Sequence, residues 1–88
     1  AMKALAYWEH QAMCARSEGD SIRLCWSLFV LAICQGVMRN DDIAVPAAQE
    51  AIVVAERSGN PTAQSMAYFA LGYLLRKSEP ERALALFD

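Results

Sequence analysis

The stretch that decides the fold is SGNPTAQSMAYFALGYLLRKSEPERALALF, residues 58–87. Its first four residues predict the end of one helix and the start of another. Gly59 suits the left-handed conformation that closes a helix, Asn60 can cap the next helix, and Pro61 fits the first helical position. Apolar residues then recur every three or four positions, as they do on one face of a helix. This pattern predicts a helix over 62–77.

Similar signals divide the rest of the chain. Ser78 and Glu81 have the spacing of a capping box, which predicts a further helix start. Gly19 is followed by Asp20 and Ser21, either of which can cap the helix that follows. Between these points the apolar residues keep helical spacing. The predicted helices span 2–17, 21–38, 45–58, 62–77 and 80–88.

The pattern predicts an all-α chain, because no segment shows the sustained alternation of a β-strand. Residues 39–42 are expected to form a polar loop, with Pro46 in the first turn of the helix after it. The last predicted helix stops in mid-pattern at Asp88. We therefore expect residues 1–88 to form a single helical-repeat segment of a longer chain.

An internal repeat supports this organisation. A shift of 40 residues superimposes helix stops, caps and positions on one helix face. The matching pairs are Ala4 and Ala44, Ala15 and Ala55, Gly19 and Gly59, Asp20 and Asn60, Phe29 and Phe69, and Leu31 and Leu71. At a shift of 35, Ala48 meets Ala83 and Ile52 meets Phe87, which we attribute to a longer loop before the third helix.

Six residues of the deciding stretch carry a family resemblance: Tyr68, Leu71, Gly72, Leu75, Ala83 and Phe87. Their order resembles the signature of tetratricopeptide repeats, in which an aromatic residue, Leu-Gly and a large apolar residue precede a small Ala and a second aromatic residue. The resemblance implies antiparallel helix pairs stacked as an α-solenoid fragment. Small residues would let these helices approach closely, and here they are Ala32, Ala48, Gly72 and Ala83.

The segments 55–61, 70–72 and 80–84 are also similar to the helical arrays of large bacterial transcriptional regulators of the LuxR and AAA types. In those proteins the array makes partner or inducer contacts, while the ATPase or DNA-binding domain lies elsewhere. The resemblance implies a bacterial, cytoplasmic regulator, of which this chain would be a non-catalytic protein-interaction arm.

Composition narrows the classes of partner. Apolar residues make up 56% of the 88 residues, so we expect the segment to pack against more protein or a second copy of itself. The net charge of −2 and the scattered Lys and Arg argue against direct nucleic-acid binding. Residues 22–38 are strongly apolar, yet Arg23 and Gln35 within them argue against a membrane span.

Cysteine, histidine and aspartate residues often serve in catalytic or metal sites, but structural roles explain them in this sequence. Cys14, Cys25 and Cys34 are odd in number and lack CxxC spacing, so we expect reduced, buried thiols. His10 is four residues before Cys14, but two ligands do not make a zinc site. Asp41 and Asp42 are expected to cap the next helix. The sequence thus predicts no catalytic, metal or cofactor site.

The tetratricopeptide resemblance also implies a binding surface, since the first helix of each pair lines the concave face in that family. Those helices would be 21–38 and 62–77, with an apolar and aromatic face that ends in two cations. The expected partner-binding residues are Trp26, Phe29, Ile33, Met66, Phe69, Tyr73, Arg76 and Lys77, with Val37 on the same face. Such a face suits an amphipathic helix or an extended peptide with an acidic end.

Three functions compete for this surface. The first is a protein-interaction scaffold. The second is a sensor, in which the helical groove holds a small apolar inducer. The third is a structural segment that dimerises or spaces other domains. The same aromatic residues could also be core residues covered by a neighbouring element.

Overall fold

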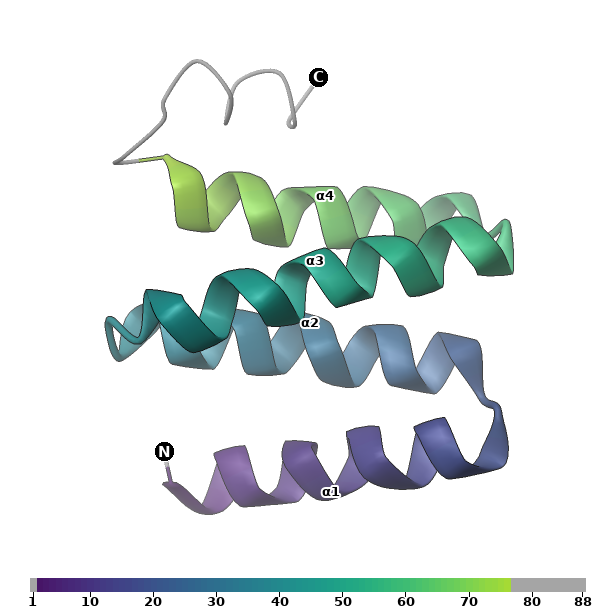
Figure 1. Cartoon of the computed structure of the whole chain (residues 1–88), viewed down its shortest axis with the longest axis horizontal. Helices are drawn as coiled ribbons and strands as arrows, with labels where there is room; N and C mark the ends of the chain where they lie inside the picture. The colour runs from purple at the N-terminus through teal and green to yellow at the C-terminus, as the bar shows by residue number, and fades with distance from the viewer. Residues whose placement is uncertain (1, 77–88) are drawn as a thin grey trace.

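The computed structural model describes residues 2–76, which fold as four α-helices. The chain reverses direction at each connection, so that consecutive helices run in opposite directions (Figure 1). The helices are α1 (Met2–Glu18), α2 (Ser21–Val37), α3 (Asp41–Ser58) and α4 (Pro61–Leu75). The prediction of an all-helical fold is confirmed for this part of the chain, whereas the predicted helix over 80–88 lies outside it.

The α1–α2 and α3–α4 connections use the same local geometry. Gly19 and Gly59 have φ values of 71° and 69°, the left-handed conformation that glycine adopts without steric cost. Asp20 Oδ1 then accepts a hydrogen bond from Arg23 N at 3.1 Å. The side chain of Asn60 caps α4 in the same way. These stops and caps were predicted correctly because each depends on a few consecutive residues.

The α2–α3 connection corrects the sequence analysis. Asp41 and Asp42 do not form a loop; they are the first two residues of α3, where a helix dipole favours negative charge. The helix therefore begins four residues earlier than expected, and Pro46 lies beyond its first turn. Arg39 closes α2 with a positive φ of 63°. Three residues separate α2 from α3, against two in each of the other described connections. Ala83 and Phe87 lie outside the described residues, so the explanation of the 35-residue shift stays a prediction.

Most of the interior consists of small side chains. One buried cluster joins all four helices and contains Ala12, Ala15, Leu24, Cys25, Leu28, Ala51, Ala55, Ala63 and Ala67. A second joins α2, α3 and α4 and contains Ala32, Ala44, Ala48, Ala70, Leu71, Leu74 and Leu75. Of the small residues expected between helices, Ala32, Ala48 and Gly72 are buried, and Ala83 lies outside the described residues.

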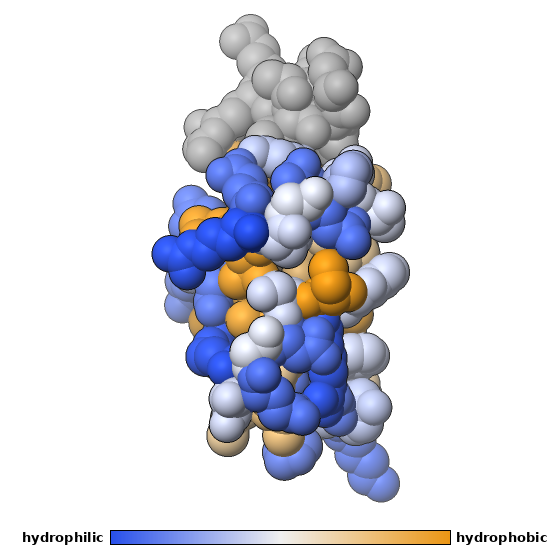
Figure 2. All heavy atoms as spheres, turned by 90° about the vertical axis from the view of Figure 1, so that its right-hand side faces the viewer, coloured by the Kyte–Doolittle hydropathy of each residue, from blue (hydrophilic) through white to orange (hydrophobic). Residues whose placement is uncertain are grey.

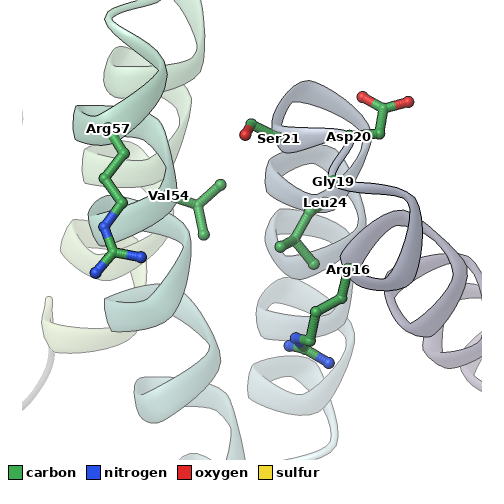
Figure 3. Close-up of a pocket in the computed structure, with 7 residues that line it drawn as sticks. All are labelled: Arg16, Gly19, Asp20, Ser21, Leu24, Val54 and Arg57. Atoms are coloured by element: carbon green, nitrogen blue, oxygen red, sulfur yellow. The ribbon is translucent and has the colours of Figure 1, made fainter.

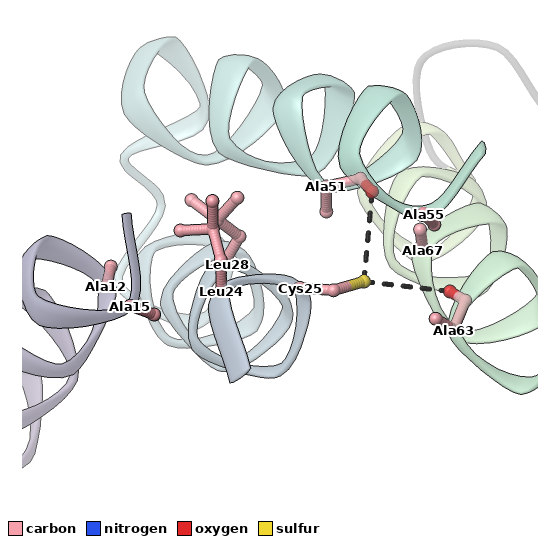
Figure 4. Packing of buried hydrophobic residues seen from close by; sticks show 9 residues of the cluster. All are labelled: Ala12, Ala15, Leu24, Cys25, Leu28, Ala51, Ala55, Ala63 and Ala67. Carbon is pink, nitrogen blue, oxygen red and sulfur yellow. Dashed lines mark hydrogen bonds between the residues drawn. The ribbon is translucent and has the colours of Figure 1, made fainter. Parts of the chain in front are cut away.

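Cys25 lies where three helices meet. Its Sγ is 3.8 Å from the carbonyl oxygen of Ala51 on α3 and 3.8 Å from that of Ala63 on α4 (Figure 4). Burial raises the pKa of this thiol. The expectation of three buried thiols is correct for Cys25 alone, because Cys14 and Cys34 are half-buried; all three are free.

The α2 and α4 helices approach each other closely at Gly36. A Cβ atom added to Gly36 would overlap Cδ2 of Leu74, which is itself buried. Leu74 therefore occupies the space that a larger residue at position 36 would need. Nothing in the local sequence indicates this role, because it depends on a residue that is 38 positions away in the chain.

We predict that Gly36→Leu lowers the free energy of unfolding by about 1–3 kcal/mol, because the new side chain must displace Leu74. Val37→Leu is the matched control, since Val37 is the next residue of the same helix and is 65% exposed. The control should change stability by less than about 0.5 kcal/mol. Urea denaturation measures both. Equal effects of the two substitutions would contradict the close approach.

We also predict that Cys25 makes stability depend on pH in the alkaline range. The folded pKa of this thiol is raised above its ordinary value of 9.0, so its contribution is fully present below that pH and is lost above it. Cys25→Ser should remove this part of the pH dependence, as measured by urea denaturation at pH 8 and pH 10. In the native protein, iodoacetamide should modify Cys14 and Cys34 before Cys25.

Candidate binding groove between α2 and α4

A groove runs between α2 and α4. Four residues of α2 and two residues of α4 line it, and its volume is about 270 Å³. The lining residues are Phe29, Val30, Ile33, Cys34, Phe69 and Tyr73. Phe29 and Ile33, Val30 and Cys34, and Phe69 and Tyr73 are each four positions apart, so each pair lies on one face of its helix. The groove is therefore apolar and aromatic.

Four aromatic rings follow one another along the groove. Trp26 meets Phe29 edge-on, with ring centroids 6.1 Å apart. Phe29 lies 6.4 Å from Phe69 across the two helices, and Phe69 stacks on Tyr73 at 6.5 Å. These separations fall in the range in which aromatic pairs attract one another. We call this set, Trp26, Phe29, Phe69 and Tyr73, the aromatic row.

Arg76 continues the aromatic row at the C-terminal end of α4. Its guanidinium carbon lies 3.9 Å from the centroid of the Tyr73 ring, a cation–π contact. Its Nη1 also donates a hydrogen bond to the carbonyl oxygen of Tyr73 at 2.6 Å. The cation is thus held beside the groove, at the end of an otherwise apolar surface.

The structure brings most of the predicted partner-binding residues together. Phe29, Ile33, Phe69 and Tyr73 line the groove, while Trp26 and Arg76 extend it at either end. Trp26 is 48% exposed and Phe69 is 50% exposed.

Other residues of the predicted face stand apart from the groove. Met66 does not line it, because its side chain packs against the first buried cluster. Val37 is exposed near the end of α2, and Lys77 lies outside the described residues.

The sequence analysis did not predict two of the residues that line the groove. Val30 and Cys34 lie four residues apart on α2, beside the stripe formed by Phe29 and Ile33. They are displaced by one position from the predicted stripe, and Cys34 had been assigned to the interior. A helix face wide enough to include positions 30 and 34 would have found them.

A second pocket, of about 140 Å³, lies beside the α1–α2 connection, and its lining includes Arg16 of α1 and Arg57 of α3 (Figure 3). The end of the molecule that carries this connection is mainly polar, with small apolar patches (Figure 2). Two of the charged side chains around this pocket have structural roles, since Arg16 pairs with Glu50 at 2.6 Å and Asp20 caps α2.

His10 and Cys14 lie on the surface of α1, with Nε2 and Sγ 3.4 Å apart. Within residues 2–76, no group of three or more potential metal-binding side chains comes together. In the same part of the chain, no helix is both long enough and apolar enough to cross a bilayer. The groove is therefore the surface feature that most needs an explanation.

Comparison of the chain with protein-family models, curated protein sequences and solved structures finds no match.

We predict that removing an exposed ring of the aromatic row costs less stability than removing a buried side chain from the same helix. Trp26→Ala should lower the free energy of unfolding by about 1–2 kcal/mol, because half of the ring is already in water. Leu28→Ala should cost about 2–5 kcal/mol, because Leu28 is only 4% exposed. Urea denaturation measures the free energy of unfolding of both variants. A larger loss for Trp26→Ala would show that Trp26 belongs to the core.

Proposed function

We propose that this chain is a tetratricopeptide-like helical-repeat segment that binds a segment of another protein in the groove between α2 and α4. The single observation that carries the proposal is the aromatic row. Two helices contribute to it from equivalent positions, Phe29 and Phe69, and rings at two of its positions are half-exposed. Exposed aromatic residues beside a groove are the usual anchors of protein interfaces.

The packing order of the helices supports a repeat arrangement. The α2 helix packs against α1, α3 and α4, and α4 packs against both α2 and α3. In a solenoid of helix pairs, the first helix of one pair contacts both helices of the preceding pair. If α2 and α4 are successive first helices, the groove between them lies on the face that would bind a partner.

The residues behind the family resemblance have roles that fit this arrangement. Leu71, Gly72 and Leu75 are buried where α4 meets its neighbours. The hydroxyl group of Tyr68 donates a hydrogen bond to the Glu56 carboxylate and so joins α4 to α3. These contacts support the proposal of stacked antiparallel pairs. The assignment to a bacterial, cytoplasmic regulator rests on sequence resemblance alone.

The shape of the groove favours a protein segment over a small inducer. Only α2 and α4 contribute residues to it, so the described residues leave it open along its length. A pocket for a small molecule usually encloses most of the surface of its ligand. An open apolar channel instead suits a helix or an extended strand of a partner.

The proposal predicts that the 88-residue chain selects peptides from a displayed library of random 12-residue sequences, and that their binding depends on the groove. Selected peptides are titrated against a Trp8→Phe variant, which leaves Trp26 as the one tryptophan reporter. Combining Phe69→Ser with Tyr73→Ser should weaken binding by at least about tenfold, because both rings line the groove. Val53→Ser should have no effect, since Val53 is an exposed apolar residue of α3 outside the groove.

Different results would favour the competing functions. A stable dimer in sedimentation that Phe69→Ser dissociates would assign the groove to self-association. Saturable binding of small aromatic compounds without any peptide binding would favour the inducer sensor. If no selected peptide responds to the Phe69 and Tyr73 substitutions, the groove is not a protein-binding site.

A further inference from the structure

The helices that form the groove carry almost no charge. The α4 helix contains no ionisable acid or base of the Asp, Glu, Lys, Arg or His type, and α2 contains only Arg23. Arg23 points away to α1, where it pairs with Glu18 at 2.8 Å and donates to Gln11. Asp41 and Asp42 belong to α3, which contributes no residue to the groove lining. In the described part of the chain, residues 2–76, therefore, no carboxylate lines the groove.

Arg76 is the exception, and its position gives the groove one charged end. Its guanidinium lies on the Tyr73 ring, and Nη1 donates a hydrogen bond to the backbone carbonyl oxygen of Tyr73. A guanidinium group has five N–H donors, so donors remain for another acceptor. Among residues 2–76, no carboxylate forms an ion pair with Arg76. The ring contact also limits the freedom of the side chain, so less entropy is lost when a partner binds it.

We infer that the partner segment is acidic, an inference that rests on the proposed function. The apolar side of the segment enters the groove, and a carboxylate of the segment pairs with Arg76. The apolar side chain lies among Phe29, Ile33 and Phe69, where it loses contact with water. The carboxylate pairs with a guanidinium that is already oriented by Tyr73. A basic segment would place like charges together at this end, and a neutral segment would leave the free N–H donors without an acceptor.

The test is a comparison of the peptides that wild-type and charge-reversed chains select from the same library of 12-residue sequences. The wild-type chain should enrich peptides that contain Asp and Glu, whereas Arg76→Glu should enrich peptides that contain Lys and Arg. Arg57→Glu is the matched control, because it makes the same charge change at an exposed residue of α3 outside the groove. This control should keep the acidic preference.

Titration of single peptides makes the test quantitative. Replacing the acidic residues of the tightest wild-type peptide with Gln should weaken its binding by about two- to fivefold, as expected for one partly exposed ion pair. The same replacement in the peptide should change its affinity for the Arg76→Gln variant very little. Raising the salt concentration should weaken the binding of the acidic peptide to the wild-type chain more than its binding to the Arg76→Gln variant.

The outcomes separate this inference from the function on which it rests. If peptides bind through Phe69 and Tyr73 but show no acidic preference, the inference is wrong and the proposed function stands. The inference is also wrong if the preference survives Arg76→Glu, or if Arg57→Glu abolishes it. If no peptide binding depends on Phe69 and Tyr73, the proposed function and the inference both fail.

Discussion

The close approach of α2, α3 and α4 around alanine and cysteine side chains is the constraint on which the rest of the structure depends. Ala32, Ala48 and Ala67 have no exposed surface, and the Cys25 thiol fits between carbonyl oxygens of two neighbouring helices. Helices can come this near only where facing side chains are short. Because α4 packs on both α2 and α3, Phe29 and Phe69 come within ring-contact distance, although 40 residues separate them.

This interior also explains why the large apolar residues lie at the surface. An alanine-lined contact between helices leaves no room for Trp26 or Phe69, which are therefore half-exposed beside the groove. Each alanine buries only a small apolar area, so the hydrophobic gain per residue is modest. The chain thus combines an interior of small side chains with an aromatic surface, and the groove follows from that division.

Features that depend on neighbouring residues were predictable from the sequence. Gly19, Asp20, Gly59 and Asn60 set their connections through local backbone geometry and local hydrogen bonds. The start of α3 was misplaced because two acidic residues are equally typical of a loop and of a first helical turn. Much of the candidate groove was predictable, since helical spacing and the 40-residue repeat placed Phe29 and Phe69 on equivalent faces. The contact of Gly36 with Leu74 was not predictable from the sequence, because it arises from tertiary packing alone.

The contact of Leu74 with Gly36 has a mechanical consequence. The α4 helix buries Ala63, Ala67 and Ala70, and short side chains such as these resist the sliding of one helix along another only weakly. A leucine side chain set against a glycine resists this sliding and fixes the axial position of α4 on α2. The alignment of the Phe29 and Phe69 rings depends on that axial position. A contact between Gly36 and the buried Leu74, neither of which lines the groove, therefore helps to fix the spacing of the rings at the surface.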